Sequence, residues 1–133
     1  MLEKLNLDMS KVHFVGSLPF KDYVSLMQIS SAHVYLTYPF VASWSLLDAM
    51  AVGCCIVASD TRPVTEFMTD NYNGLLVDFF NVDQLVDKIV YALDNQDKVQ
   101  IIRDNAVKTI LDDYDFKDTL PRHIDFIKSF IRK

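Results

Sequence analysis

The chain has 133 residues, a typical length for one domain, and half of them are hydrophobic, which is enough for a packed core. Its net charge of −5 disfavours a nucleic-acid-binding scaffold because like charges repel, although a small phosphorylated ligand needs only local hydrogen-bond donors. Only 3 glycines are present, so the chain has no glycine-rich nucleotide-binding loop.

The two cysteines, Cys54 and Cys55, are adjacent in the sequence. Adjacent cysteines rarely pair with each other, so a disulfide scaffold is excluded and a reduced, cytoplasmic setting is expected. We predict that both thiols pack as small hydrophobic side chains in a strand. The first residues mix charged and apolar side chains, so no signal peptide is predicted. No apolar run approaches the roughly 18 residues of a transmembrane helix.

Short apolar strands alternate with helical stretches along much of the chain. Strands are predicted at residues 12–15, 33–36, 54–58 and 75–78. Helices are predicted between them at 21–29, 43–52 and 64–68, and after them at 82–93, 98–111 and 115–132. The run at 54–58 is apolar throughout, which is typical of a parallel strand buried on both faces. The alternation predicts an α/β fold in one domain, a Rossmann-like parallel sheet of at least four strands flanked by helices.

Local signals support several helix boundaries. Ser43 is a candidate N-cap for the helix at 43–52, and Gly53 follows the end of that helix. Pro63 occupies a first-turn position, where a missing N–H is tolerated. Pro121 is expected to interrupt the last helix near its start.

Open parallel sheets bind ligands at the carboxyl ends of their strands, which selects the loops at 16–20, 37–44, 59–63 and around Asp78. The loop at 37–44 leads into a helix whose first turn offers free N–H groups and the positive end of the helix dipole. These groups can bind a diphosphate. Ser43 and Ser45 can add hydroxyl donors, and Asp48, one turn further along, can accept hydrogen bonds from a ribose diol.

Three aromatic residues of this segment, Tyr38, Phe40 and Trp44, are candidates to form a wall for a base or a sugar. A structural alternative is that Ser43 only caps the helix, the aromatic side chains fill the core, and Asp48 is solvated. Spacing alone leaves both interpretations open.

A series of short motifs follows in a fixed order from this segment onward. They are Pro39-Phe40, Leu47-Asp48-Ala49-Met50-Ala51, Gly53, Ile56-Val57-Ala58-Ser59-Asp60, Pro63 with Glu66, and Asn73-Gly74-Leu75-Leu76-Val77-Asp78. With these motifs, residues 10–115 resemble the donor-binding domain of retaining glycosyltransferases of the GT-B fold, the large family 4 or "group 1" type. The order and spacing of several motifs make this resemblance specific.

The resemblance implies that the domain binds a nucleotide-diphosphate sugar for retaining transfer to a glycan, lipid or small-molecule acceptor, as in polysaccharide biosynthesis. It implies no metal cofactor, because backbone amides and basic side chains carry the diphosphate. It assigns no catalytic residue to this chain. The implied donor-binding residues are Gly16, Ser17, Tyr38, Pro39, Phe40, Ser43, Trp44, Ser45, Leu46 and Asp48.

The chain departs from the family pattern at its acidic pair. Members carry two glutamates eight positions apart; here the second is Asp48, and neither Tyr38 nor Phe40 supplies the first carboxylate. Val41 replaces the glycine after Pro-Phe, and Cys55 replaces a proline. The first glutamate is usually read as a contact to the donor sugar or the departing diphosphate, so that contact is in doubt.

Members also begin this domain with a strand and a loop that carry Arg and Lys to the diphosphate, and nothing of that kind fits before residue 12. We therefore expect either the C-terminal part of a larger transferase, whose acceptor-binding domain lies outside this chain, or a truncated relative of such a transferase. A cytoplasmic location is expected, with peripheral membrane contact left open for the full protein. The alternative is a non-catalytic, degenerate transferase domain that binds a nucleotide or a protein partner.

Two other folds with strand–helix alternation are excluded by the residues that come directly after 12–15. A receiver domain needs an acidic pair there, and a dinucleotide-binding domain needs a glycine loop. The chain has Gly16-Ser17-Leu18-Pro19 instead.

The other residues that could carry a function are expected to have structural roles. His13, His33 and His123 are scattered without partners at metal-ligand spacing, so no metal site is predicted. The acidic residues at 112–118 are expected to be caps and solvated charges. Phe79-Phe80 is expected to pack against the C-terminal helices or to form a domain contact. The last helix is expected to be an appendage with an apolar face, through which the chain self-associates as a homo-oligomer.

Overall fold

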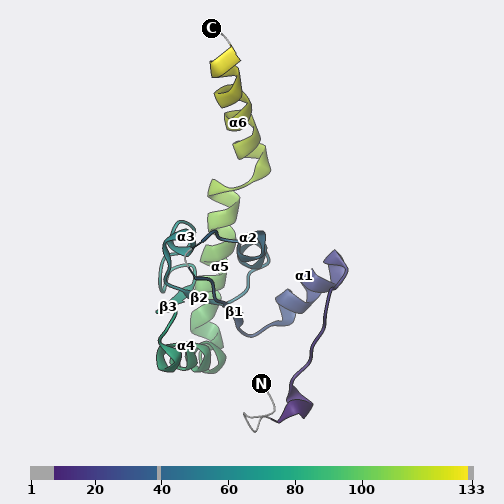
Figure 1. The fold of residues 1–133 in the computed structure, drawn as a ribbon, viewed down its shortest axis with the longest axis vertical. Helices are drawn as coiled ribbons and strands as arrows, with labels where there is room; N and C mark the ends of the chain where they lie inside the picture. Colours follow the sequence, from purple (N-terminus) through teal and green to yellow (C-terminus); the bar gives the residue numbers. More distant parts are fainter. Residues whose placement is uncertain (1–7, 39, 132–133) are drawn as a thin grey trace.

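The computed structural model describes residues 8–38 and 40–131. Its elements are η2 (Met9–Lys11), α1 (Phe20–Ile29), β1 (His33–Tyr35), α2 (Trp44–Ala51), β2 (Ile56–Ser59), α3 (Arg62–Thr65), β3 (Leu75–Val77), α4 (Val82–Asp94), α5 (Gln96–Asp113) and α6 (Phe116–Ile131). Figure 1 shows their arrangement. Helices on both sides of a parallel sheet make this a Rossmann-like α/β fold, as predicted.

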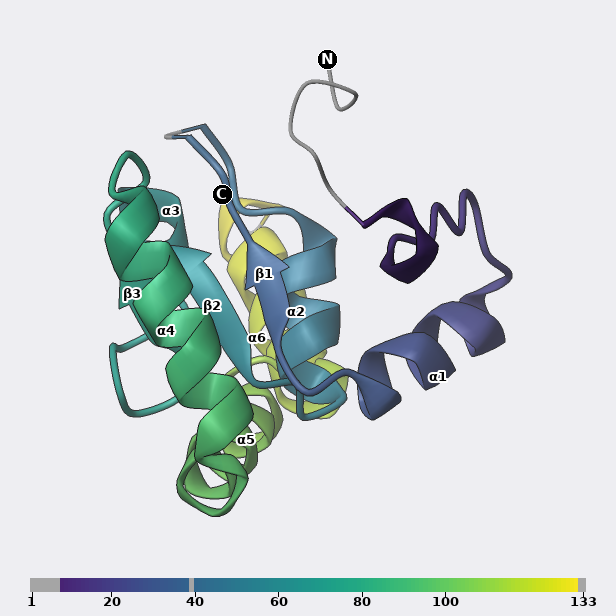
Figure 2. The same ribbon diagram turned by 90° about the horizontal axis from the view of Figure 1, so that it is seen from below.

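The sheet has the strand order β1-β2-β3, and both pairs are parallel. The central strand is the most buried, because every residue of β2 is inaccessible to solvent. The register aligns Val34 with Val57 and Val57 with Leu75. Parallel pairing brings the carboxyl ends of all three strands to one edge, seen above β1 and β2 in Figure 2.

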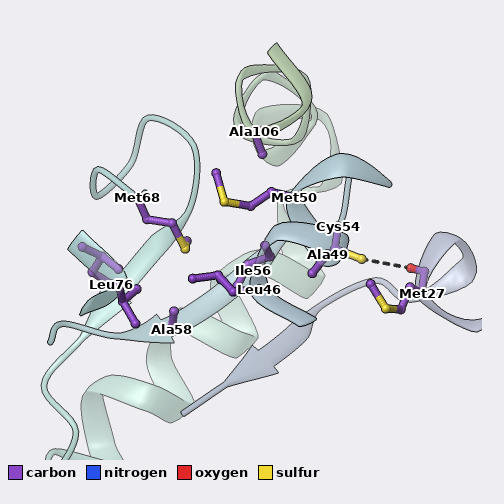
Figure 3. Close-up of a cluster of buried hydrophobic side chains, with 11 residues drawn as sticks. Met27, Leu46, Ala49, Met50, Cys54, Ile56, Ala58, Met68, Leu76 and Ala106 are labelled. Atoms are coloured by element: carbon purple, nitrogen blue, oxygen red, sulfur yellow. Dashed lines mark hydrogen bonds between the residues drawn. The ribbon is translucent and has the colours of Figure 1, made fainter. Parts of the chain in front are cut away.

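Two hydrophobic clusters pack on the two faces of the sheet, because successive side chains of β2 point to opposite sides. Ile56 and Ala58 join α2 in the first cluster, which Figure 3 shows. Val57 joins β3, α4 and α5 in the second. α5 contributes to both clusters, so it holds the two layers together.

Both cysteines are free and buried, which confirms the prediction that they pack as small hydrophobic side chains. They precede β2, which begins at Ile56, so the prediction that they lie in the strand itself is wrong; Cys54 packs with α2, and Cys55 packs with α4 and α5. The thiol of Cys54 donates to the carbonyl of Met27 at 3.2 Å and ties α1 to the core (Figure 3). Burial raises the pKa of both thiols, so the uncharged form is favoured.

The predicted helix signals lie at the observed boundaries. Ser43 is the N-cap residue of α2, and Gly53 follows α2 with φ of +78°, a conformation that glycine adopts without strain. Pro63 lies in the first turn of α3. The predicted interruption at Pro121 is wrong, because α6 continues through this residue, which lies near the start of the helix.

The predicted strand at residues 12–15 is wrong. This segment is extended but pairs with no described strand, and Phe14 is 76% exposed. A strand is stabilised by hydrogen bonds to a neighbour, and the segment lies away from the sheet beyond α1 (Figures 1 and 2). The sheet of the described residues therefore has three strands rather than at least four.

α6 projects from the rest of the molecule, and none of its residues is buried (Figure 1). Its exposed apolar side chains include Phe116, Phe126, Ile127, Phe130 and Ile131. Within the described ranges, no helix has both the length and the apolar character needed to cross a membrane.

Candidate donor-binding site

The ends of β1 and β2 are held together by side-chain hydrogen bonds at the carboxyl edge of the sheet. Ser59 is fully buried; its hydroxyl accepts from the N–H of Thr37 at 3.0 Å and donates to the Thr37 carbonyl at 2.8 Å. The N–H of Asp60 donates to the carbonyl of Val77 at 2.6 Å, which joins β2 to β3. The loops that leave this edge therefore start from fixed points.

The N-terminus of α2 opens at the same edge. Ser43 occupies the N-cap position, but its side chain accepts no capping hydrogen bond from the helix. Its N–H donates to the phenol oxygen of Tyr35 at 2.8 Å, and its hydroxyl contacts those of Tyr35 and Ser45. Within the described ranges, the N–H groups of Trp44 and Ser45 meet no acceptor, so they can bind an anion.

This geometry contradicts the structural alternative in which Ser43 only caps the helix. The residue has the position of an N-cap but not the function of one, because its hydroxyl contacts those of Tyr35 and Ser45 and accepts from no amide of the first turn. The hydroxyls of Ser43 and Ser45 are therefore close to the free amides. The predicted pair of hydroxyl donors and amide donors is brought together here.

Asp48 lies one turn inside α2 and is half-buried. Burial raises the pKa of the Tyr23 phenol, and the negative charge of Asp48 raises it further. Tyr23 also lines a groove of about 650 Å³ with Gly16 and Leu18.

The aromatic side chains of the 37–44 loop do not fill the core. Tyr38 is 60% exposed, Phe40 is 87% exposed and Trp44 is 82% exposed. This finding contradicts the structural alternative for these three residues and leaves their side chains accessible to a ligand. Pro39, also predicted to contact the donor, lies outside the described residues.

Phe79 and Phe80 pack against Tyr38 across the end of β2, a contact that the sequence did not predict. The ring centroid of Tyr38 lies 5.5 Å from that of Phe79 and 5.7 Å from that of Phe80, in edge-to-face geometry. These three side chains form what we refer to as the aromatic cluster.

The turn that carries the aromatic cluster is held by hydrogen bonds at the start of α4. The Asp78 carboxylate accepts from the N–H of Phe80 at 2.8 Å, and the N–H of Asp78 donates to the Gln84 side chain at 2.8 Å. Asn81 accepts from the N–H of Gln84 and caps α4. The cluster is therefore presented on a braced turn rather than a loose loop.

The structure shows how accessible three further predicted site residues are to a ligand. Leu46 is fully buried, and its N–H donates to the Ser43 carbonyl at 3.0 Å, so neither its side chain nor its amide is available to a ligand. Gly16 and Ser17 are exposed in the loop that leads into α1. Gly16 has φ of +61°, and a Cβ added to it would meet no atom within 4 Å, so its surroundings are open.

Sequence reasoning missed Tyr35 and Ser59. Tyr35 is the last residue of β1, and its side chain points to the α2 face of the sheet. The ring of a tyrosine at the end of a strand can pack in the core while its hydroxyl reaches the next helix. The sequence therefore contained a signal for this contact. Ser59 ends an otherwise apolar strand, where a buried hydroxyl must find a partner.

His33 lies at the opposite end of β1 from this edge, whereas His123 of α6 lines a pocket with Trp44 and Leu47 of α2. In the ranges that the structure describes, no group of three or more His, Cys, Asp or Glu residues is placed to hold a metal ion. His33 is half-buried at the start of β1, and burial lowers the pKa of its imidazole.

Comparison with known proteins decides the family. The family described as "Glycosyl transferases group 1" matches residues 2–109, most of the chain. The chain belongs to the group 1 glycosyltransferases. The predicted resemblance is confirmed at this level, and the three-stranded sheet with its helices corresponds to the GT-B type.

Individual relatives agree with this assignment. An uncharacterised glycosyltransferase of Methanocaldococcus jannaschii is 26% identical over 113 residues, which are 84% of this chain and 29% of that protein. Anabaena HepE, solved in complex with UDP, superposes with a TM-score of 0.84 at 19% identity, over 96% of this chain and 36% of that one. Sucrose-phosphate synthase of Thermosynechococcus elongatus superposes with a TM-score of 0.85 at 18% identity, over 98% of this chain and 32% of that one. This group 1 chain thus spans about a third of the length of these proteins.

Proposed function

We propose that the protein containing this chain transfers a glycosyl group from a nucleotide-diphosphate sugar to an acceptor, with retention of the anomeric configuration. The observation that carries the proposal is the open N-terminus of α2 in a chain of the group 1 glycosyltransferase family. At this point of the sheet edge, the hydroxyls of Ser43 and Ser45 lie beside backbone N–H groups that meet no acceptor in the described ranges. The UDP complex of a structurally similar protein supports the same ligand class.

In this proposal, the diphosphate lies against the N–H groups of Trp44 and Ser45 and the Ser45 hydroxyl. The positive end of the α2 dipole and these donors stabilise its negative charge without a metal ion. The ribose lies toward Asp48, whose carboxylate can accept from both hydroxyls of a diol. The exposed rings of Phe40 and Trp44 flank the site, and Gly16 and Ser17 contact the donor from the loop before α1.

The acceptor class is left as a glycan, a lipid or a small molecule, bound by a part of the protein outside this chain. The leaving nucleoside diphosphate gains charge as the glycosidic bond breaks. Donors aimed at that charge therefore lower the barrier more than they strengthen substrate binding. This is the catalytic contribution proposed for the start of α2.

The test is a titration of the full-length protein with UDP and GDP, followed by transfer assays with the corresponding nucleotide sugars. We expect binding of one nucleotide and formation of a product whose anomeric configuration, read by NMR, matches the donor. An inverted product would refute the retaining mechanism alone. Absence of binding to every nucleoside diphosphate tested would refute the proposal as a whole.

A second candidate function has one observation in its favour. The position where the family carries its first glutamate is occupied here by Tyr38, which packs in the aromatic cluster and supplies no carboxylate. A degenerate domain that binds a nucleotide without turnover would show the same feature. Tight nucleotide binding with no transfer and no donor hydrolysis by the full-length protein would favour this alternative.

A further inference from the structure

The hydroxyl of Tyr35 makes an unusual connection between a strand and the start of a helix. The ring of Tyr35 packs against the hydrophobic cluster beneath α2, so its height above the sheet is set by the core. Its oxygen accepts from the N–H of Ser43 at 2.8 Å, and its O–H donates to the Ser43 hydroxyl at 3.2 Å. One phenol thus holds both the backbone and the side chain of the N-cap residue.

These contacts link three hydroxyl groups in series. The Tyr35 O–H donates to the oxygen of Ser43, and the hydroxyls of Ser43 and Ser45 share a hydrogen bond in which either oxygen can be the donor. When Ser43 is the donor, the Ser45 O–H has no acceptor within this chain of hydroxyls. It lies beside the free amides at the end of α2, where an anion is the acceptor that completes the series.

A hydroxyl that already accepts a hydrogen bond becomes a stronger donor, so the bonds of such a chain strengthen one another. The other end of the 38–42 loop is fixed independently, because Ser59 holds Thr37 through two hydrogen bonds. Removing the Tyr35 oxygen would therefore release the start of α2 and leave the strand ends joined.

We propose that Tyr35 is a positioning residue, which holds the N-cap of α2 and orients the Ser43 and Ser45 hydroxyls toward the diphosphate of the donor. This inference rests on the proposed function, since it requires a diphosphate at that helix end. Tyr35 itself does not touch the ligand.

The first test compares ligands with and without the diphosphate in the full-length protein. Tyr35→Phe removes one oxygen and keeps the ring in the core. We expect its affinity for UDP or GDP, whichever the unmodified protein binds, to fall about fivefold to tenfold, the size of one cooperative hydrogen bond. Affinity for the corresponding nucleoside should not change. Equal loss for nucleoside and diphosphate, or no loss for either, would overturn the inference.

The second test measures coupling between residues. Ser45→Ala is made alone and together with Tyr35→Phe; if the phenol orients Ser45, the second substitution costs much less once the first is present. Additive losses would count against the chain of hydroxyls. Tyr91→Phe is the matched control, since Tyr91 lies on α4 and no hydrogen bond of its phenol is among those that the structure shows. Failure of the unmodified protein to bind either nucleotide would instead remove the proposed function, and this inference with it.

Discussion

At Asp48, an experiment can distinguish the ligand-binding role that the family resemblance implies from a purely structural role. Its carboxylate makes no hydrogen bond or ion pair with the side chains that the structure describes. A carboxylate in this state is not needed to hold α2, which leaves it free to bind a ribose. We therefore expect its role to be visible in binding rather than in stability.

Replacement of Asp48 by asparagine should weaken binding of the nucleotide by about tenfold to a hundredfold, the loss of one charge-assisted hydrogen bond. Asp48→Glu should bind as well or better, because it restores the residue usual in the family. Calorimetric titration and a melting curve of each variant provide the measurement, with Asp94→Asn on the far end of α4 as the control. Unchanged affinity in Asp48→Asn would remove the residue from the site.

The buried thiols carry a prediction about pH. Burial raises the pKa of Cys54 and Cys55, so the folded protein holds protons that the unfolded chain releases as the pH rises above the ordinary thiol value of about 8.5. Their contribution to stability is complete below that value and is lost above it. Denaturant unfolding should give a lower free energy of unfolding at pH 10 than at pH 7.5. The double variant Cys54→Ala, Cys55→Ala should show a smaller difference, and an equal difference would contradict this assignment.

Among the elements, α2 has the most demanding boundaries, since its start forms the proposed site and its end must turn at once into β2. Gly53 makes that turn with a positive φ, and a side chain there would lie 3.4 Å from Val107, an ordinary contact. Backbone strain rather than a steric clash should therefore govern substitutions at this position.

Gly53→Ala should lower the free energy of unfolding by about 1–2 kcal/mol, the cost of a left-handed conformation for an ordinary residue. Gly53→Asn should cost less, because asparagine tolerates this conformation better than alanine does. Chemical denaturation with the two variants side by side measures the difference. Equal losses would show that the space beside Val107, and not φ, limits the position.

At the scale of the whole molecule, α6 leaves an apolar surface without a partner in the described structure. The rings of Phe126 and Phe130 pack edge to face at 4.9 Å, and both remain more than half exposed. Exposed aromatic pairs on a projecting helix favour association with another apolar surface.

We expect the 133-residue chain to self-associate through α6. Light scattering at increasing concentration should give a mass above that of one chain, and Phe126→Ser with Phe130→Ser should restore the single-chain mass. Tyr72→Ser, on the loop before β3, serves as an exposed aromatic control. A single-chain mass at high concentration for the unmodified chain would refute this expectation.

The sequence by itself determined the class of fold and most of its elements. The apolar run at 54–58 predicted a strand buried on both faces, and β2 has every residue buried, because such a run can be satisfied only between two layers. Ser43, Gly53 and Pro63 marked helix ends because their local conformational preferences do not depend on distant contacts. The group 1 family was likewise visible in the order of its motifs.

Tertiary structure decided everything that depends on a partner remote in sequence. Residues 12–15 have the composition of a strand, but no described strand lies beside them, so they remain unpaired. Phe79 and Phe80 meet Tyr38 because parallel strands bring residues some forty positions apart to one edge. Tyr35 bonds to Ser43, whose side chain makes no capping contact, for the same reason: a hydrogen bond between a strand and the start of a helix depends on how the two pack, which local sequence does not specify.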